Sequence, residues 1–261
     1  MASILDQGDY RVYLDAGFTV DAFRLDYSVL DGTDVLDGST QYFDVTSYVQ
    51  AVGISRGRQK YREPIDAGRC TIQIDDTDGD FSVVNSNSIY WDPVTDRLGF
   101  QPTRRVRVER NGVRLFDGQI VTYDQQLTID NQSIVTVQAS DDLKQLNAVQ
   151  ITSHTPTAQL SNERIAAILS RSEVNLFQGV GQQSLGTGVA NLGSQLVESG
   201  ATVQDYFQRI YIAEQGRIFM SKSGVFTFQP RIGVTAATLA ATFSDQGDGG
   251  IPFRNFKVVY E

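Results

Sequence analysis

Short runs in which apolar and polar residues alternate, separated by Asp-Gly and Asn-Gly pairs, constrain the fold of this chain more than any other feature. Arg105–Glu109 is the clearest run, because a period of two places Val106 and Val108 on one face and the charged residues on the other. Asn111-Gly112 follows it and is a strong hairpin signal, since both residues tolerate positive φ in a type I′ turn. The first half is therefore expected to be antiparallel β structure.

The same alternation predicts further strands at Arg11–Asp15, Phe23–Tyr27, Cys70–Asp75, Val113–Thr122 and Ser133–Gln138. No strand–helix–strand rhythm is visible, so a doubly wound nucleotide-binding fold is not expected. Cys70 is the only cysteine, which excludes an internal disulfide, and with a single histidine the chain cannot form a Cys/His zinc cluster. Cys70 is expected to be a small buried residue.

The second half changes from strand to mixed patterning. The helix signals are a start at Ser140–Leu143, the spacing of Ile165, Ile168 and Leu169 within Asn162–Arg171, and a capping box that begins at Thr202, with Asp205 in place of glutamate. After that cap, one helical stripe is expected to contain Val203, Tyr206, Phe207, Ile210 and Tyr211. Arg217–Ser221 and Val225–Gln229 predict a second hairpin, and Asn255–Glu261 predicts a terminal strand.

The segment Gln178–Leu192 is rich in Gly, Gln, Ser and Thr and predicts a long exposed loop. It contains few large apolar groups, so by itself it buries little surface to offset its ordering entropy. We therefore expect neighbouring subunits or partner proteins to order this loop; a mobile surface loop without a role is the alternative.

The net charge of −9 and the pI of about 4.7 argue against a protein that grips nucleic acid, because phosphate binding needs a cationic face. An acidic wall would still let DNA slide past it. No apolar run approaches the length of a membrane span and the N-terminus lacks the pattern of a secretory signal, so we expect no membrane anchor and synthesis in a reducing cytoplasm.

Catalytic and metal-binding signals are weak. His154 is the only histidine and no Gly-x-Ser-x-Gly elbow presents a nucleophile for it. The run Asp76–Asp80 places aspartates at the first, third and fifth positions of a calcium loop, but Phe81 stands where the sixth should be glycine and Asn87 where the twelfth should be glutamate. A tight turn is the expected role of Asp76, Asp78 and Asp80. We therefore predict no catalytic, cofactor or metal site.

A set of motifs in order resembles the hub, baseplate or minor tail proteins of bacteriophages. In the first half these are Asp44–Val49, Val52–Gln59, Ala67–Asp76, Asp78–Phe81, Asn85–Trp91, Arg104–Val108 and Leu115–Ile120; in the second half they are Ala213–Phe219, Gly224–Phe228, Arg231 and Ile251–Arg254. Two departures from the usual pattern are Asp76, where asparagine is common, and Ile89, where proline precedes the tyrosine.

This resemblance implies a mainly β fold in which a tail-tube-like antiparallel β-barrel, residues 1–148, is followed by a smaller mixed α+β hub domain, residues 149–261, with the Gly-rich loop at 178–192. It also implies a structural virion protein, not an enzyme, that forms a homotrimeric ring at the distal end of the tail tube and a passage for DNA. The implied partners are the tail tube, distal tail, tape measure and fibre proteins, without sequence-specific DNA binding.

Two other function classes stay open. A phage cell-wall glycoside hydrolase would use paired carboxylates, and an acidic β protein offers many Asp and Glu pairs. A carbohydrate- or receptor-binding β module would use aromatic side chains, of which the chain has 14 Phe, 11 Tyr and one Trp.

Overall fold

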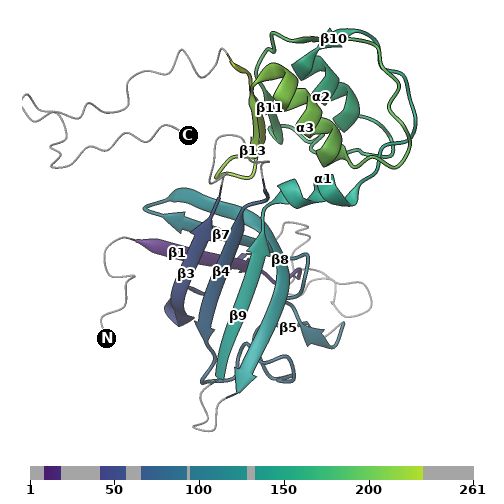
Figure 1. Cartoon of the computed structure of the whole chain (residues 1–261). Helices are drawn as coiled ribbons and strands as arrows, with labels where there is room; N and C mark the ends of the chain where they lie inside the picture. The colour runs from purple at the N-terminus through teal and green to yellow at the C-terminus, as the bar shows by residue number, and fades with distance from the viewer. Residues whose placement is uncertain (1–8, 19–41, 57–65, 93–94, 128–132, 232–261) are drawn as a thin grey trace, which may run out of the picture.

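The computed structural model describes residues 9–18, 42–56, 66–92, 95–127 and 133–231. Two groups of elements stand end to end, a strand-rich body and a group of helices and short strands (Figure 1). The predicted strand at Phe23–Tyr27 and the terminal strand at Asn255–Glu261 lie outside the described residues. The prediction of a mainly antiparallel β chain with a smaller α+β part is confirmed.

The strand-rich body is one seven-stranded sheet in the order β2-β1-β7-β8-β9-β4-β3. All its pairings are antiparallel. Its strands are β1 (Tyr10–Asp15), β2 (Tyr42–Asp44), β3 (Val49–Ser55), β4 (Arg69–Asp75), β7 (Arg105–Arg110), β8 (Val113–Leu127) and β9 (Ser133–Ser140). In Figure 1, β1 and β7 run crosswise to β3, β4 and β9, so the sheet curls.

The curl follows from the length and bend of β8. Its first half pairs with β7 and its second half with β9, and Gln119 pairs with both Arg105 and Ser140. The register with β9 shifts between Ile120 and Thr122, as at a β-bulge. Gly118 stands beside the bend, where a Cβ atom would lie 2.4 Å from the carbonyl oxygen of Ser140, so the close approach of the two backbones requires glycine.

The hydrophobic core of the curled sheet comes from the alternating strands. The four residues expected to form its apolar faces, Ile72, Ile74, Val106 and Val108, are fully buried. The predicted β7–β8 hairpin is confirmed: Asn111 and Gly112 have φ values of 50° and 72°, as a type I′ turn demands.

A second hydrophobic core lies in the helical group. The helices are α1 (Gln145–Ala148), which follows the 3₁₀ turn η3 (Asp142–Lys144), α2 (Ser161–Leu169) and α3 (Val203–Glu214). The Asp141 carboxylate accepts from Leu143 N at 3.1 Å, and Thr202 Oγ1 accepts from Asp205 N at 3.1 Å, so both predicted helix starts are confirmed. The five-residue stripe predicted for α3 is buried.

Short strands complete the second core. β13 (Arg217–Met220) and β14 (Phe226–Gln229) form the second predicted hairpin, and β11 (Gln183–Leu185) adds to β14 in parallel. β10 (Gln159–Leu160) pairs with β12 (Asn191–Leu192). In the first body a small hairpin of β5 (Trp91–Asp92) and β6 (Arg97–Leu98) precedes β7, and the 3₁₀ turn η2 (Thr46–Tyr48) links β2 to β3.

The segment 178–192 is mostly exposed, as expected, but it is not all loop, because β11 and β12 lie within it and pair inside the chain. Side chains distant in sequence hold its backbone: Asn162 accepts from Gly188 N at 2.9 Å, and the buried Glu214 carboxylate accepts from Val189 N at 3.0 Å and Ala190 N at 2.7 Å. This chain itself therefore holds part of the segment, and an ordering role for neighbouring subunits or partner proteins stays a prediction. Among the described helices, none is long and apolar enough to cross a membrane.

Candidate interaction surface

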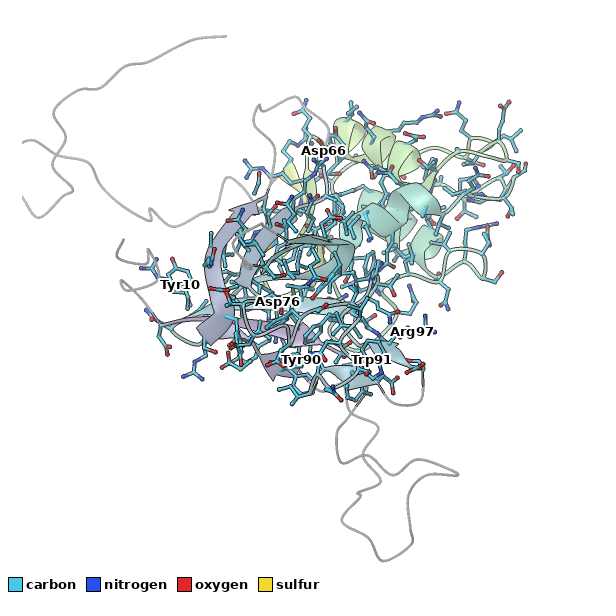
Figure 2. All side chains as sticks on the ribbon, turned by 90° about the horizontal axis from the view of Figure 1, so that it is seen from below. Tyr10, Asp66, Asp76, Tyr90, Trp91 and Arg97 are labelled. Atoms are coloured by element: carbon cyan, nitrogen blue, oxygen red, sulfur yellow. The ribbon has the colours of Figure 1, made fainter. Side chains whose placement is uncertain are left out.

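The end of the curled sheet farthest from the helices is built from the turns between β4 and β7. Figure 2 looks onto this end and shows Asp76, Tyr90, Trp91 and Arg97 there. These turns include the tail-like motifs at Asp78–Phe81 and Asn85–Trp91, so the local sequence that carries the resemblance is gathered at one place in the fold.

Asp76 anchors the first of these turns. Its Oδ1 accepts from Phe81 N at 2.7 Å, and its Oδ2 accepts from Gln125 Nε2 at 2.9 Å and from Ser133 Oγ at 3.0 Å. Burial raises the pKa of Asp76, and these hydrogen bonds oppose the rise. Asp76 therefore serves as a turn anchor, as the sequence predicts, and its two oxygens already accept hydrogen bonds from the protein.

Asp78 is exposed and Asp80 is half-buried, and no cluster of three or more His, Cys, Asp or Glu that could hold a metal ion occurs in the described parts of the chain. The absence of a tight calcium site stays a prediction. Millimolar calcium is expected to leave the melting temperature unchanged, whereas a rise that is lost in Asp78→Asn would contradict the turn interpretation.

An aromatic cluster fixes the same turns from beneath. The rings of Phe81, Tyr90 and Phe100 lie within 6 Å of one another, with centroid separations of 5.0, 4.7 and 5.9 Å. Tyr48 packs on Phe81 at 5.1 Å and Phe43 on Tyr90 at 5.2 Å, both edge-on. Such pairs favour one packing arrangement, so the turns are held on a rigid base.

Three apolar side chains on these anchored turns face solvent. Val83 is 50% exposed, Val84 82% and Ile89 62%. A single exposed valine is ordinary, whereas three exposed apolar side chains within seven residues make these turns a candidate contact surface. We call Val83, Val84 and Ile89 the end surface.

The other tail-like motifs take structural roles. Asp44 Oδ1 accepts from Thr46 N at 3.0 Å, and Thr46 Oγ1 in turn accepts from Val12 N at 2.9 Å, which ties the start of β3 to β1. Gly68 N donates to Asp141 Oδ2 at 2.8 Å. Ile251–Arg254, which also carries the resemblance, lies outside the described residues.

An ion-pair cluster that sequence reasoning missed joins the sheet to η3. Arg105 Nη1 donates to Asp142 Oδ2 at 2.7 Å, and Arg105 Nη2 donates to the buried Asp117. Arg114 Nη1 lies 3.1 Å from Asp117 Oδ2. Burial opposes the charge of Arg105, but the two carboxylates outweigh it and raise its pKa. The alternation of Arg105–Glu109 places Arg105 on the polar face but gives no sign of its partners.

Cys70 and His154 are the single cysteine and the single histidine of the chain. Burial raises the pKa of the Cys70 thiol to about 12, so the thiolate that would react is scarce. The backbone of His154 pairs with that of Val197, and its Nδ1 lies 3.3 Å from the Thr152 carbonyl oxygen. Neither residue shows a catalytic pairing within the described structure.

Neither a family profile nor a curated protein sequence matches the chain. Its fold is similar to that of a 43 kDa tail protein of prophage MuSo2 from Shewanella oneidensis, with a TM-score of 0.50 and 11% identity over 72% of this chain and 51% of that one. It is also similar to a tail protein from Neisseria meningitidis MC58, with a TM-score of 0.51 and 10% identity over 84% of this chain and 50% of that one. The chain thus has a fold found in phage tail proteins and spans about half the length of these two.

Proposed function

We propose that this chain is a structural component of a bacteriophage tail and forms part of the hub or baseplate at the distal end of the tail tube. The observation that carries the proposal is the fold similarity, which extends over 84% of the chain to a protein whose own description is that of a tail protein. The ordered tail-like motifs support it independently, because they come from sequence and not from the fold comparison.

The finer part of the proposal is a ring of identical subunits, a homotrimer, with a central passage for DNA and with the tail tube, distal tail, tape measure and fibre proteins as neighbours. Closed rings arise when one surface meets a different surface of the next copy. The net charge of −9 suits a passage that DNA crosses without sticking, since like charges repel. The proposal retains the division into residues 1–148 and 149–261 as two domains; η3 and α1, which precede residue 149, pack in the second core through Leu143 and Leu146.

The proposal gives the end surface a role as a contact with the adjoining tail protein. Apolar groups fixed on a rigid base need little ordering when they are covered, so more of the gained burial contributes to affinity. An assembly role also agrees with the hydrogen bonds of Asp76, which anchor the turn next to this surface.

Mass photometry of the purified chain, followed by electron microscopy of the intact virion, tests the proposal. A trimer, with density for this chain below the tail tube, is the expected result. Val84→Asp and Ile89→Asp are expected to weaken incorporation into tails without lowering the melting temperature, whereas the matched change Val180→Asp, at a side chain that is fully exposed on another loop, is expected to do neither.

A monomer that is absent from virions would overturn the tail assignment. Turnover of purified peptidoglycan by the chain would favour the hydrolase alternative instead. Normal incorporation of both end-surface variants would remove the contact role of the end surface but leave the tail assignment standing.

A further inference from the structure

A pocket of about 160 Å³ opens between α2, α3 and the segment that follows β12. This is roughly ten times the space that one water molecule needs. Its lining includes Arg164, Tyr206 and Arg209, together with the apolar Leu196 and Ile210. No aspartate or glutamate is among the described residues that line it. In a chain with a net charge of −9, a pocket with two arginines and no carboxylate is a local reversal of charge.

Arg164 is held in the wall of this pocket, and its partners among the described residues are all neutral. It is 3% exposed. Its Nη2 donates to the carbonyl oxygens of Thr157 at 2.7 Å and Gly193 at 3.1 Å, and its Nη1 donates to Tyr206 Oη at 2.8 Å. These bonds fix the guanidinium but supply no opposite charge. A buried cation without a counterion is costly, and an anion beside it would lower that cost.

Two further donors meet at the same place. Tyr206 Oη already accepts from Arg164, so its own hydrogen is left to donate, and no acceptor for it occurs among the described residues. Arg209 lies three residues further along α3, which places it on the same side of that helix. It is exposed, and within the described structure it makes no hydrogen bond or ion pair.

We propose that this pocket binds a carboxylate of a partner polypeptide. Arg209 supplies a guanidinium that can bind both carboxylate oxygens, Tyr206 adds a neutral donor, and the fixed charge of Arg164 stands behind it. The proposal does not depend on the role in a tail.

The apolar side of the pocket favours a polypeptide over a small free anion. Leu196 is 57% exposed at the pocket, and Ile210 is buried beside it. A peptide that ends in an apolar residue carries a carboxylate and a hydrocarbon side chain only a few atoms apart, which matches the arginines and the leucine. An inorganic anion would leave Leu196 facing water.

Fluorescence anisotropy with three labelled pentapeptides of one core sequence tests the proposal on the full chain. The first ends in Val-Leu with a free carboxylate, the second is its C-terminal amide, and the third is the amide with one internal aspartate. We expect saturable binding of the first or the third peptide, and an affinity for the second that is lower by about tenfold or more. The reason is that losing one hydrogen bond to a charged group lowers affinity by about that factor. The peptide that binds identifies a chain end or an aspartate side chain as the source.

Arg209→Gln is expected to weaken the binding several-fold without changing the melting temperature. Tyr206→Phe is expected to weaken it as well, with a lower melting temperature, because Arg164 Nη1 then loses its hydrogen-bond acceptor. Arg97→Gln is the matched control, because Arg97 is also exposed but lies on β6 in the other body. Equal binding of all three peptides, an equal loss in Arg97→Gln, or no saturable binding at millimolar peptide would each overturn the proposal. Arg164→Gln is avoided as the main test, because Arg164 also holds the chain at Thr157 and Gly193.

Discussion

Replacing Val106 by aspartate tests the interpretation of the curled sheet at its centre. Val106 is fully buried in β7, where it lies opposite Leu14 on one side and Gly118 on the other. The change removes about 1.5–3 kcal/mol of apolar burial and leaves a charge without a partner, at about 3–5 kcal/mol. The sum is a large part of the 5–15 kcal/mol that typically stabilises a domain.

Urea unfolding followed by tryptophan fluorescence measures this loss, because Trp91 is the only tryptophan and belongs to the same core. Val113→Asp is the matched control: it makes the same chemical change in the same hairpin, at a residue that is 47% exposed. It is expected to cost about 1 kcal/mol or less, the range of strand propensities.

The pH dependence of V106D gives a second readout. Burial would raise the pKa of the introduced carboxyl in the folded state above the value of about 3.9 in the unfolded chain. The folded state would then retain its proton more readily, so the destabilisation should grow as pH rises from about 4. Equal unfolding midpoints for V106D and V113D at pH 7 would refute the placement of Val106 in the core.

Three further predictions follow from single residues. Glu214→Gln should make the segment 178–192 more sensitive to limited proteolysis than it is in the parent, because the Glu214 carboxylate anchors its backbone. Burial disfavours this carboxylate, yet the backbone hydrogen bonds that it accepts hold its pKa below the usual value. Equal cleavage of variant and parent would contradict that anchor. Cys70 should react with a thiol reagent at pH 8 only after unfolding, since burial raises its pKa to about 12; fast labelling of the native chain would contradict its burial. Burial raises the pKa of Asp141 to about 6, so its contribution to stability should fall as pH rises through 6, and an Asp141→Asn variant should lose that part of the pH profile; an unchanged profile would contradict it.

Local patterns predicted the elements that depend on neighbours in sequence. The Asn111-Gly112 turn, the Thr202 cap and the α3 stripe each follow from a few adjacent residues, and the structure contains all three. The strand predicted at Val113–Thr122 instead continues to Leu127, because its polar second half pairs with β9, a contact that no alternation of apolar residues marks.

The candidate sites could not be predicted from the sequence, because they are formed by contacts between residues far apart in the chain. Asp76 is bonded to Gln125, which lies 49 residues away, and Glu214 holds a backbone segment 24 residues before it. In sequence Arg164 is one charged residue of a predicted helix, and no pattern marks its partners, which are backbone carbonyl groups and the hydroxyl of Tyr206. The positive charge of the pocket can therefore be recognised only in the folded chain, where α2 and α3 bring Arg164 and Arg209 to one pocket.

The ion-pair cluster around Arg105 has a mechanical consequence. Asp117 belongs to the β7–β8 hairpin, Asp142 belongs to the turn that leads into the helices, and Arg114 also donates to the Ser223 carbonyl oxygen at 3.3 Å. Two separate attachments, Arg105 to Asp142 and Arg114 to Ser223, thus resist a rotation of one core against the other, and such a rotation would leave the buried Asp142 carboxylate without its ion-pair partner. We therefore expect the two cores to move as one rigid body and not about a hinge between them.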